Sequence, residues 1–164
     1  DFMHRIGGLE KDYHTGVISS DPTNHQLMVD TRKAKIEKIA DFIPEQKVIG
    51  DSRADTLIVG WGGTYGHLLE TMMRLQDNGK KVALAHFRFI HPLPKNSYEI
   101  LKRYKTIIVA EQNTGHFASY LRGKFDDIKI TKFNRVEGQP FSVSELVRAF
   151  TKIIERNYNG SDKN

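Results

Sequence analysis

Residues 55–67 constrain the fold of this chain more than any other stretch. Residues 56–59 form a continuous run of β-branched and aliphatic side chains, the pattern of a strand buried on both faces of a parallel sheet. A cluster of glycines that permits a sharp turn comes next: Gly60, Gly62 and Gly63. Apolar residues then recur at helical spacing until Gly79 ends the helix. The stretch therefore predicts a strand, a glycine turn and a helix, which is the opening of a βαβ unit.

A dinucleotide site is the first function to test for such a turn. Its fingerprint is G-x-G-x-x-G, with an acidic residue at the end of the second strand. Here Tyr65 occupies the third glycine position, and the second strand ends in Phe87-Arg88. Both departures argue against NAD or FAD, and we interpret the turn as a connector between a strand and a helix.

The composition narrows the class of protein. A chain of 164 residues can form one domain with an attached arm, and the absence of Cys excludes disulfides and a Cys nucleophile. No apolar run approaches the length of a membrane span, so we expect a cytoplasmic protein with no membrane partner. The net charge of +5 is spread over helix faces with acids between them, so we expect no nucleic acid partner. The chain opens at Asp1 rather than at Met, and we expect a fragment of a longer protein.

The rest of the chain continues the alternation of strands and helices. Residues 81–87 and 106–110 predict two more buried strands, and residues 128–133 alternate as an edge strand does. Near the C-terminus, Ser142 and Glu145 have the spacing of a capping box at the start of a long amphipathic helix. This order predicts an α/β protein, a three-layer α/β/α sandwich with a mainly parallel sheet.

The N-terminal part follows a different pattern. Residues 1–24 are polar and broken by glycines, so we expect an irregular arm that orders only by docking on other parts of a complex. Thr23 or Asn24 is expected to cap a helix with an apolar face that ends before Pro44. The predicted organisation is an arm plus linker helix over 1–45, an α/β domain over 46–157 and a disordered tail over 158–164.

Ligands of such sheets dock where parallel strands end at their carboxyl side. Four loops are predicted there, namely 61–67, 88–94, 111–116 and 134–140, and we expect any pocket to lie at this edge and not at the opposite one. The helix N-termini at 64–66 and 113–116 have the character of anion sites. The candidate pocket or interface residues are Gly62, Gly63, Thr64, His91, Glu111, Asn113, Gly115 and His116.

The residues of these loops do not form the patterns that are typical of a catalytic site or a metal site. The histidines at 67, 86, 91 and 116 do not have the spacing of metal ligands on one helix, so we expect no metal site. A nucleophile elbow, a phosphate-binding P-loop and a paired-carboxylate cleft are all absent from the sequence. We therefore predict no catalytic residue in this chain.

Several motifs together resemble one family. Gly-Gly-Leu-Glu-Lys-Asp at 7–12, the Asp55–Thr64 run, Arg-Phe-Ile-His-Pro-Leu-Pro at 88–94 and Glu-Gln-Asn-Thr-Gly at 111–115 are similar, in this order, to the alpha subunit of 2-oxoacid:ferredoxin oxidoreductases. Within that family the 2-oxoglutarate enzyme is the most similar.

The resemblance implies a fold like the transketolase C-terminal domain, with five strands of which the first, short one runs antiparallel. It also implies that the complete complex oxidatively decarboxylates a 2-oxoacid, forms the acyl-CoA and reduces ferredoxin. Thiamine diphosphate with Mg²⁺ would lie between the N-terminal domain of the same subunit and a separate beta subunit, and the iron–sulfur clusters would lie elsewhere. No cofactor is expected in this chain itself.

Two other readings stay open at this point. One is a stand-alone nucleotide- or CoA-binding α/β module. The other is the C-terminal domain of a transketolase-type or E1-type thiamine enzyme, which shares the fold but does not share the Gly-Leu-Glu-x-Asp motif of residues 8–12.

Overall fold

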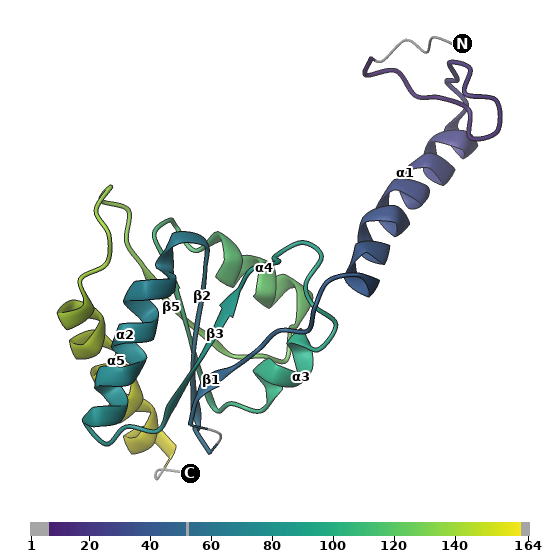
Figure 1. The fold of residues 1–164 in the computed structure, drawn as a ribbon. Coiled ribbons are helices and arrows are strands. Elements are labelled where there is room, and N and C mark those ends of the chain that lie inside the picture. Colours follow the sequence, from purple (N-terminus) through teal and green to yellow (C-terminus); the bar gives the residue numbers. More distant parts are fainter. Residues whose placement is uncertain (1–6, 52, 162–164) are drawn as a thin grey trace. The chain divides into compact units, whose positions relative to one another are not determined.

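The computed structural model describes residues 7–51 and 53–161 and divides the chain into two compact units, Asp1–Ile43 and Pro44–Asn164 (Figure 1). The second unit contains one five-stranded sheet. Its strands are β1 (Ile49–Gly50), β2 (Thr56–Trp61), β3 (Val82–Phe87), β4 (Thr106–Glu111) and β5 (Ile130–Asn134).

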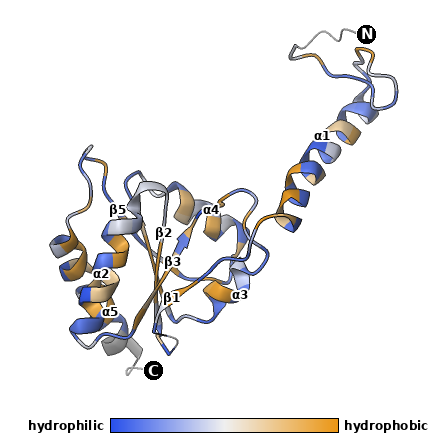
Figure 2. Ribbon diagram, in the orientation of Figure 1, coloured by the Kyte–Doolittle hydropathy of each residue, from blue (hydrophilic) through white to orange (hydrophobic). Residues whose placement is uncertain are grey.

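The strand order is β1-β3-β2-β4-β5, and only β1 runs antiparallel to its neighbour. Both the mixed five-stranded sheet and the edge position of β5 confirm the predictions from sequence. The three central strands are buried along almost their whole length, because β-branched and aliphatic side chains fill both of their faces. In Figure 2 the hydrophobic colouring covers much of β3, up to its blue carboxyl end.

Helices cover both faces of the sheet and complete the three layers (Figure 1). The helices α2 (Tyr65–Asp77) and α5 (Val143–Ser161) enclose one apolar core with the sheet, around Leu68, Leu146 and Phe150. On the other face, α3 (Ser97–Lys102) and α4 (His116–Lys124) enclose a second core, around Leu101 and Phe117. Among the described residues, no helix is both long enough and apolar enough to cross a membrane.

Two local predictions for α5 are wrong. The capping box does not form: the Ser142 hydroxyl lies 2.9 Å from that of Ser144, and the Glu145 carboxylate pairs with Arg135 instead. A cationic partner from another element therefore outcompetes the local contact. The helix also continues through residues 158–161, part of the tail predicted to be disordered, because extending a formed helix requires only one more backbone bond per residue. Residues 162–164 of that tail lie outside the described residues.

The first unit is more ordered than its sequence predicts. Its helix α1 (Pro22–Glu37) begins at Asp21, whose carboxylate accepts from the amide of Asn24 at 2.7 Å, so the cap is neither Thr23 nor Asn24. A short 3₁₀ helix, η1 (Lys38–Asp41), follows it. The expected apolar face of α1 is not buried, since Asn24 is its one buried residue in the described chain.

Asn24 and Glu10 tie the described part of the arm to α1. The Asn24 side chain accepts from the amide of Tyr13 at 2.9 Å and donates to the carbonyl of Lys11 at 2.9 Å. Glu10 lies 3.0 Å from Arg32 and 2.9 Å from His25. Arg32, and then His25, lower the pKa of Glu10 to about 2. The arm is thus held by its own helix, while residues 1–6 lie outside the described chain.

Candidate functional site

The strands β2, β3, β4 and β5 all run parallel, so their carboxyl ends meet at one edge of the sheet. This carboxyl edge carries the four loops expected from the sequence. Glu111, the last residue of β4, is the most constrained polar group there, since its side chain is 1% exposed.

The Glu111 carboxylate accepts four hydrogen bonds. The Trp61 indole, the Asn113 side chain and the amide of Phe117 donate to Oε1 at 3.1, 3.1 and 2.8 Å. The amide of Ala118 donates to Oε2 at 2.9 Å. Because Phe117 and Ala118 lie in the first turn of α4, the buried carboxylate also faces the positive end of that helix. Glu111 therefore holds β2, its own loop and α4 together.

Asn113 completes the same arrangement. Its Oδ1 accepts from the amides of Gly115 and His116 at 2.7 and 3.0 Å. Glu111 and Asn113 together thus bind the amides of residues 115–118 at the start of α4. The prediction of an anion site at 113–116 is therefore wrong, because side chains of the loop already occupy these donors.

Gly115 is required by this geometry. Its φ of +91° is unfavourable for residues with a side chain, and an added Cβ would lie 2.5 Å from Nδ2 of Asn134. The spacing Glu-x-Asn-x-Gly thus encodes a loop that caps a helix with a carboxylate, an amide and a left-handed glycine.

The three glycines near the end of β2 have different roles. Gly60 lies within β2, where an added Cβ would lie 2.2 Å from Cδ1 of Leu68, so this glycine permits close packing of α2 on the strand. Gly62 makes the turn, with a φ of +60°. Gly63 has open space around it. The hydroxyl of Thr64 donates to the Trp61 carbonyl at 2.8 Å and closes the turn.

A small cavity of about 160 Å³ lies between this turn and the Glu111 loop. It brings together five of the predicted site residues: Gly62, Gly63, Thr64, Glu111 and Asn113. The other three do not line it. His91 lies 3.1 Å from the hydroxyl of Tyr120, His116 lies 3.0 Å from that of Thr114, and Gly115 is the cap of α4.

A larger cavity of about 900 Å³ lies at the same edge, where a pocket was expected, and the predicted loops 61–67 and 88–94 form part of its lining, but its aromatic residues were not among the predicted site residues. We call it the aromatic cavity, since its lining includes Trp61, Tyr65, His86, Phe87 and Phe89. Tyr65 falls at helical spacing with the buried residues of α2 but is 43% exposed. Burial lowers the pKa of the His86 imidazole, so this ring is held neutral beside the apolar groups. The two phenylalanines on either side of Arg88, Phe87 and Phe89, were the available signal.

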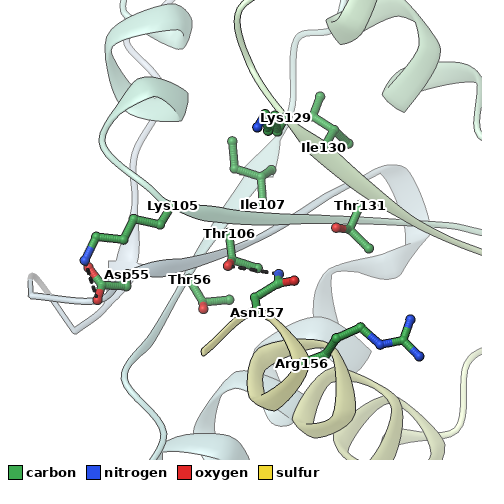
Figure 3. Close-up of a pocket in the computed structure, with 10 residues that line it drawn as sticks. All are labelled: Asp55, Thr56, Lys105, Thr106, Ile107, Lys129, Ile130, Thr131, Arg156 and Asn157. Atoms are coloured by element: carbon green, nitrogen blue, oxygen red, sulfur yellow. Dashed lines mark hydrogen bonds and ion pairs between the residues drawn. The ribbon is translucent and has the colours of Figure 1, made fainter. Parts of the chain in front are cut away.

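The opposite edge is hollowed as well. A cavity of about 710 Å³, here called the amino-edge cavity, lies at the amino ends of β2, β4 and β5 beside α5 (Figure 3). The expectation that only the carboxyl edge forms a pocket is therefore wrong. The lining of the amino-edge cavity includes the threonines at or near the starts of these strands, Thr56, Thr106 and Thr131.

The carboxyl edge does not fit a metal–diphosphate group. Mg²⁺ favours carboxylate, carbonyl and water oxygens in near-octahedral geometry, but the carboxylate of Glu111 is already bound by four N–H donors. Within the described ranges, no group of three or more His, Asp or Glu side chains could hold a metal ion. We derive no catalytic step from these residues.

Comparisons with known proteins agree on one family. The sequence pattern of the pyruvate:ferredoxin oxidoreductase core domain II matches residues 54–146. The chain is 42% identical over 88% of its length to the 2-oxoglutarate oxidoreductase subunit KorA of Mycobacterium tuberculosis. It is 34% identical over 95% of its length to the 2-oxoacid:ferredoxin oxidoreductase 1 subunit alpha of Aeropyrum pernix. The chain spans 22% and 25% of the length of these two relatives.

Solved structures give the same result. A 2-oxoglutarate:ferredoxin oxidoreductase from Magnetococcus marinus, with 2-oxoglutarate, coenzyme A and succinyl-CoA bound, matches with a TM-score of 0.80 and 31% identity. That match covers 92% of this chain and 26% of the solved one. A split-gene transketolase matches over 65% of this chain and 40% of its own with a TM-score of 0.51 and 16% identity, a likeness of fold alone. The resemblance to 2-oxoacid:ferredoxin oxidoreductase alpha subunits is confirmed, and the chain belongs to the pyruvate:ferredoxin oxidoreductase core domain II family.

Proposed function

We propose that this chain is an assembly domain in the alpha subunit of a cytoplasmic 2-oxoacid:ferredoxin oxidoreductase, with 2-oxoglutarate as the preferred 2-oxoacid. The complete complex decarboxylates the 2-oxoacid, forms the acyl-CoA and reduces ferredoxin, using thiamine diphosphate, Mg²⁺ and iron–sulfur clusters held by other parts. The partners of this chain are the N-terminal domain of the same subunit, the thiamine-binding beta subunit and the other subunits of the complex.

One observation carries this proposal: the carboxyl edge uses its polar groups internally and leaves its aromatic groups open. Glu111 and Asn113 are committed to α4. In contrast, Tyr65 is 43% and Phe89 39% exposed beside the aromatic cavity. Exposed aromatic side chains around a hollow are typical of the centre of a protein–protein interface. Such an edge is suited to contact a partner rather than to transfer protons.

The first unit supports the same conclusion independently. It exposes large apolar side chains along the arm and α1: Leu9, Tyr13, Val17, Ile18, Leu27, Val29, Ile36, Ile39 and Phe42. Phe42 is 81% exposed. Large apolar side chains that stay exposed in such number are typical of a segment that contacts a partner. We propose that this unit packs on other parts of the alpha subunit.

The test is assembly of the complex from the full-length alpha subunit and its beta subunit. Phe89→Asp places a charge at the centre of the proposed contact, and loss of an aromatic anchor there weakens association by about 2 kcal/mol or more, roughly thirtyfold. The matched control is Met73→Asp, since Met73 is 50% exposed on α2 and lies outside both the carboxyl-edge loops and the aromatic cavity. Circular dichroism checks that both variants fold.

The expected result is that Phe89→Asp loses the beta subunit on gel filtration and the turnover of 2-oxoglutarate with it, whereas Met73→Asp keeps both. Full retention of the beta subunit by a folded Phe89→Asp variant would rule out this edge as the contact. Loss of turnover with the beta subunit still bound would point to a catalytic role at this edge instead.

A further inference from the structure

The lining of the amino-edge cavity is rich in polar side chains, although the core beside it is apolar. Three threonines lie at or near the starts of three adjacent strands: Thr56 in β2, Thr106 in β4 and Thr131 in β5. Thr56 and Thr106 pair directly in register, and Thr131 pairs with Ile108, two residues beyond Thr106. Because side chains alternate between sheet faces, all three lie on the face that α5 covers. Further along the same face the strands carry aliphatic residues.

The hydroxyl of Thr56 has no hydrogen-bond partner among the described residues, although Thr56 is only 2% exposed. No fully buried side-chain nitrogen or oxygen in the described chain lacks a partner, so this hydroxyl opens onto the cavity. Next to it, Thr106 is 8% exposed and accepts from the Asn157 side chain at 3.1 Å, which leaves its own proton free to donate (Figure 3). A hydroxyl that opens onto a cavity and has no partner in the protein is available to hydrogen-bond a ligand or water there.

The charges of the lining are predominantly positive. Lys105 pairs with Asp55 at 3.2 Å, as Figure 3 shows. Lys129 and Arg156 also line the cavity, and neither forms an ion pair within the described chain. Both side chains are exposed, whereas Thr56 and Thr106 are buried. Cations at the mouth and hydroxyls in the floor attract an anion and then offer it hydrogen bonds.

We propose that the amino-edge cavity binds a small phosphorylated molecule. Its phosphate monoester lies against Arg156 at the mouth, and its uncharged body enters between the threonines. The volume of about 710 Å³ falls within the range of about 300–1,000 Å³ that is typical of small-molecule sites. Guanidinium and ammonium groups are the usual partners of phosphate in proteins. This site does not depend on the assembly role, because it uses none of the carboxyl-edge residues.

The test is titration of the 164-residue chain, followed by amide chemical shifts in NMR spectra. The probes are inorganic phosphate, adenosine 5′-monophosphate and, as an uncharged counterpart, adenosine. The expected result is saturable shifts at the amides of Thr56, Thr106 and residues 129–131 with both phosphates. The nucleotide should bind more tightly than phosphate alone, and adenosine should cause no saturable shift. Nucleotide binding no tighter than that of phosphate alone would rule out the proposed seat for the body of the ligand.

Two matched variants distinguish binding in the cavity from nonspecific electrostatic attraction of the nucleotide to the basic chain. Arg156→Gln should weaken nucleotide binding about tenfold, the usual contribution of one charge-assisted hydrogen bond. Arg148→Gln makes the same change on the exposed side of the same helix, outside the cavity, and should leave the affinity unchanged. Equal weakening by both variants would contradict the proposal, as would the absence of saturable binding.

Thr56→Val tests the floor of the cavity without a change of charge or volume. It should weaken nucleotide binding severalfold while leaving the melting temperature equal to or above that of the unmodified chain, since the hydroxyl has no partner to lose. An unchanged affinity for the nucleotide in this variant would show that the Thr56 hydroxyl does not bind the ligand. Tighter binding of an acidic peptide than of the nucleotide would overturn the small-molecule assignment.

Discussion

Replacing Glu111 by Gln tests how the carboxyl edge is held together. Glutamine has nearly the same shape, and its carbonyl oxygen at the position of Oε1 can still accept from Trp61, Asn113 and Phe117. Its amide group then faces the N–H of Ala118, 2.9 Å from the present Oε2. Two donors meet there, so a buried backbone amide loses its partner.

The cost follows from these contacts. A lost hydrogen bond to a charged group contributes about 1.5–3 kcal/mol. Removing a negative charge from the start of α4 adds about 0.3–1 kcal/mol. We therefore expect Glu111→Gln to lower the free energy of unfolding by about 3 kcal/mol. For a chain of this size the melting temperature should fall by about 6–12 °C.

Thermal and urea denaturation followed by circular dichroism measure this loss. The control is Glu99→Gln, the same chemical change at an exposed position in the first turn of α3, which should cost only the charge contribution of about 0.3–1 kcal/mol or less. A loss below about 1 kcal/mol for Glu111→Gln would refute the reasoning, because the carboxylate could not then be the acceptor that closes the first turn of α4.

Three further predictions concern single positions. Gly115→Ala should cost about 2 kcal/mol or more in urea denaturation, because of its φ and the nearby Asn134 side chain, whereas Gly123→Ala in the same helix, with nothing within 4 Å, should not destabilise. Since the pKa of Glu10 is lowered from 4.5 to about 2, its contacts with Arg32 and His25 should hold the arm above pH 4.5 and weaken as the pH falls toward 2. The protection factors of the Asp12 and Ser19 amides, which correct for the pH dependence of intrinsic exchange, should fall over that range, and Glu10→Gln should reduce this fall. Ser142→Ala should leave the urea midpoint nearly unchanged, because its hydroxyl contacts Ser144 and not the amide of Glu145. A decrease of about 1 kcal/mol in the free energy of unfolding would instead indicate that the capping box forms in solution.

The elements that the sequence predicted well are those decided by local pattern. The central strands were placed within two residues at each end, because continuous aliphatic runs such as 56–59 and 106–110 fit only a strand buried on both faces. The predictions that failed depended on contacts with neighbouring loops and elements, which compete with the contacts inside one helix turn. Glu145 pairs with Arg135 rather than with its own helix start, and Glu111 reaches the amides of the helix that follows its loop.

The cavities were the least predictable features. The aromatic cavity depends on β1 and the segment before it lying along β3, which brings Gln46 within 3.1 Å of the His86 carbonyl across 40 residues of chain. The amino-edge cavity depends on the register that aligns Thr56 with Thr106. Neither alignment leaves a mark in the local sequence, because a threonine at the start of a strand is an ordinary β-forming residue.

Isothermal titration calorimetry of the chain with thiamine diphosphate and Mg²⁺ tests most directly whether it is an assembly domain without a cofactor site of its own. Glu111 is committed to four N–H donors, and the turn after β2 offers the hydroxyl of Thr64 but no carboxylate. The expected result is no saturable heat at any cofactor concentration up to the millimolar range. Saturable binding at micromolar thiamine diphosphate would contradict the account, and its loss in Glu111→Gln would locate the site at the carboxyl edge.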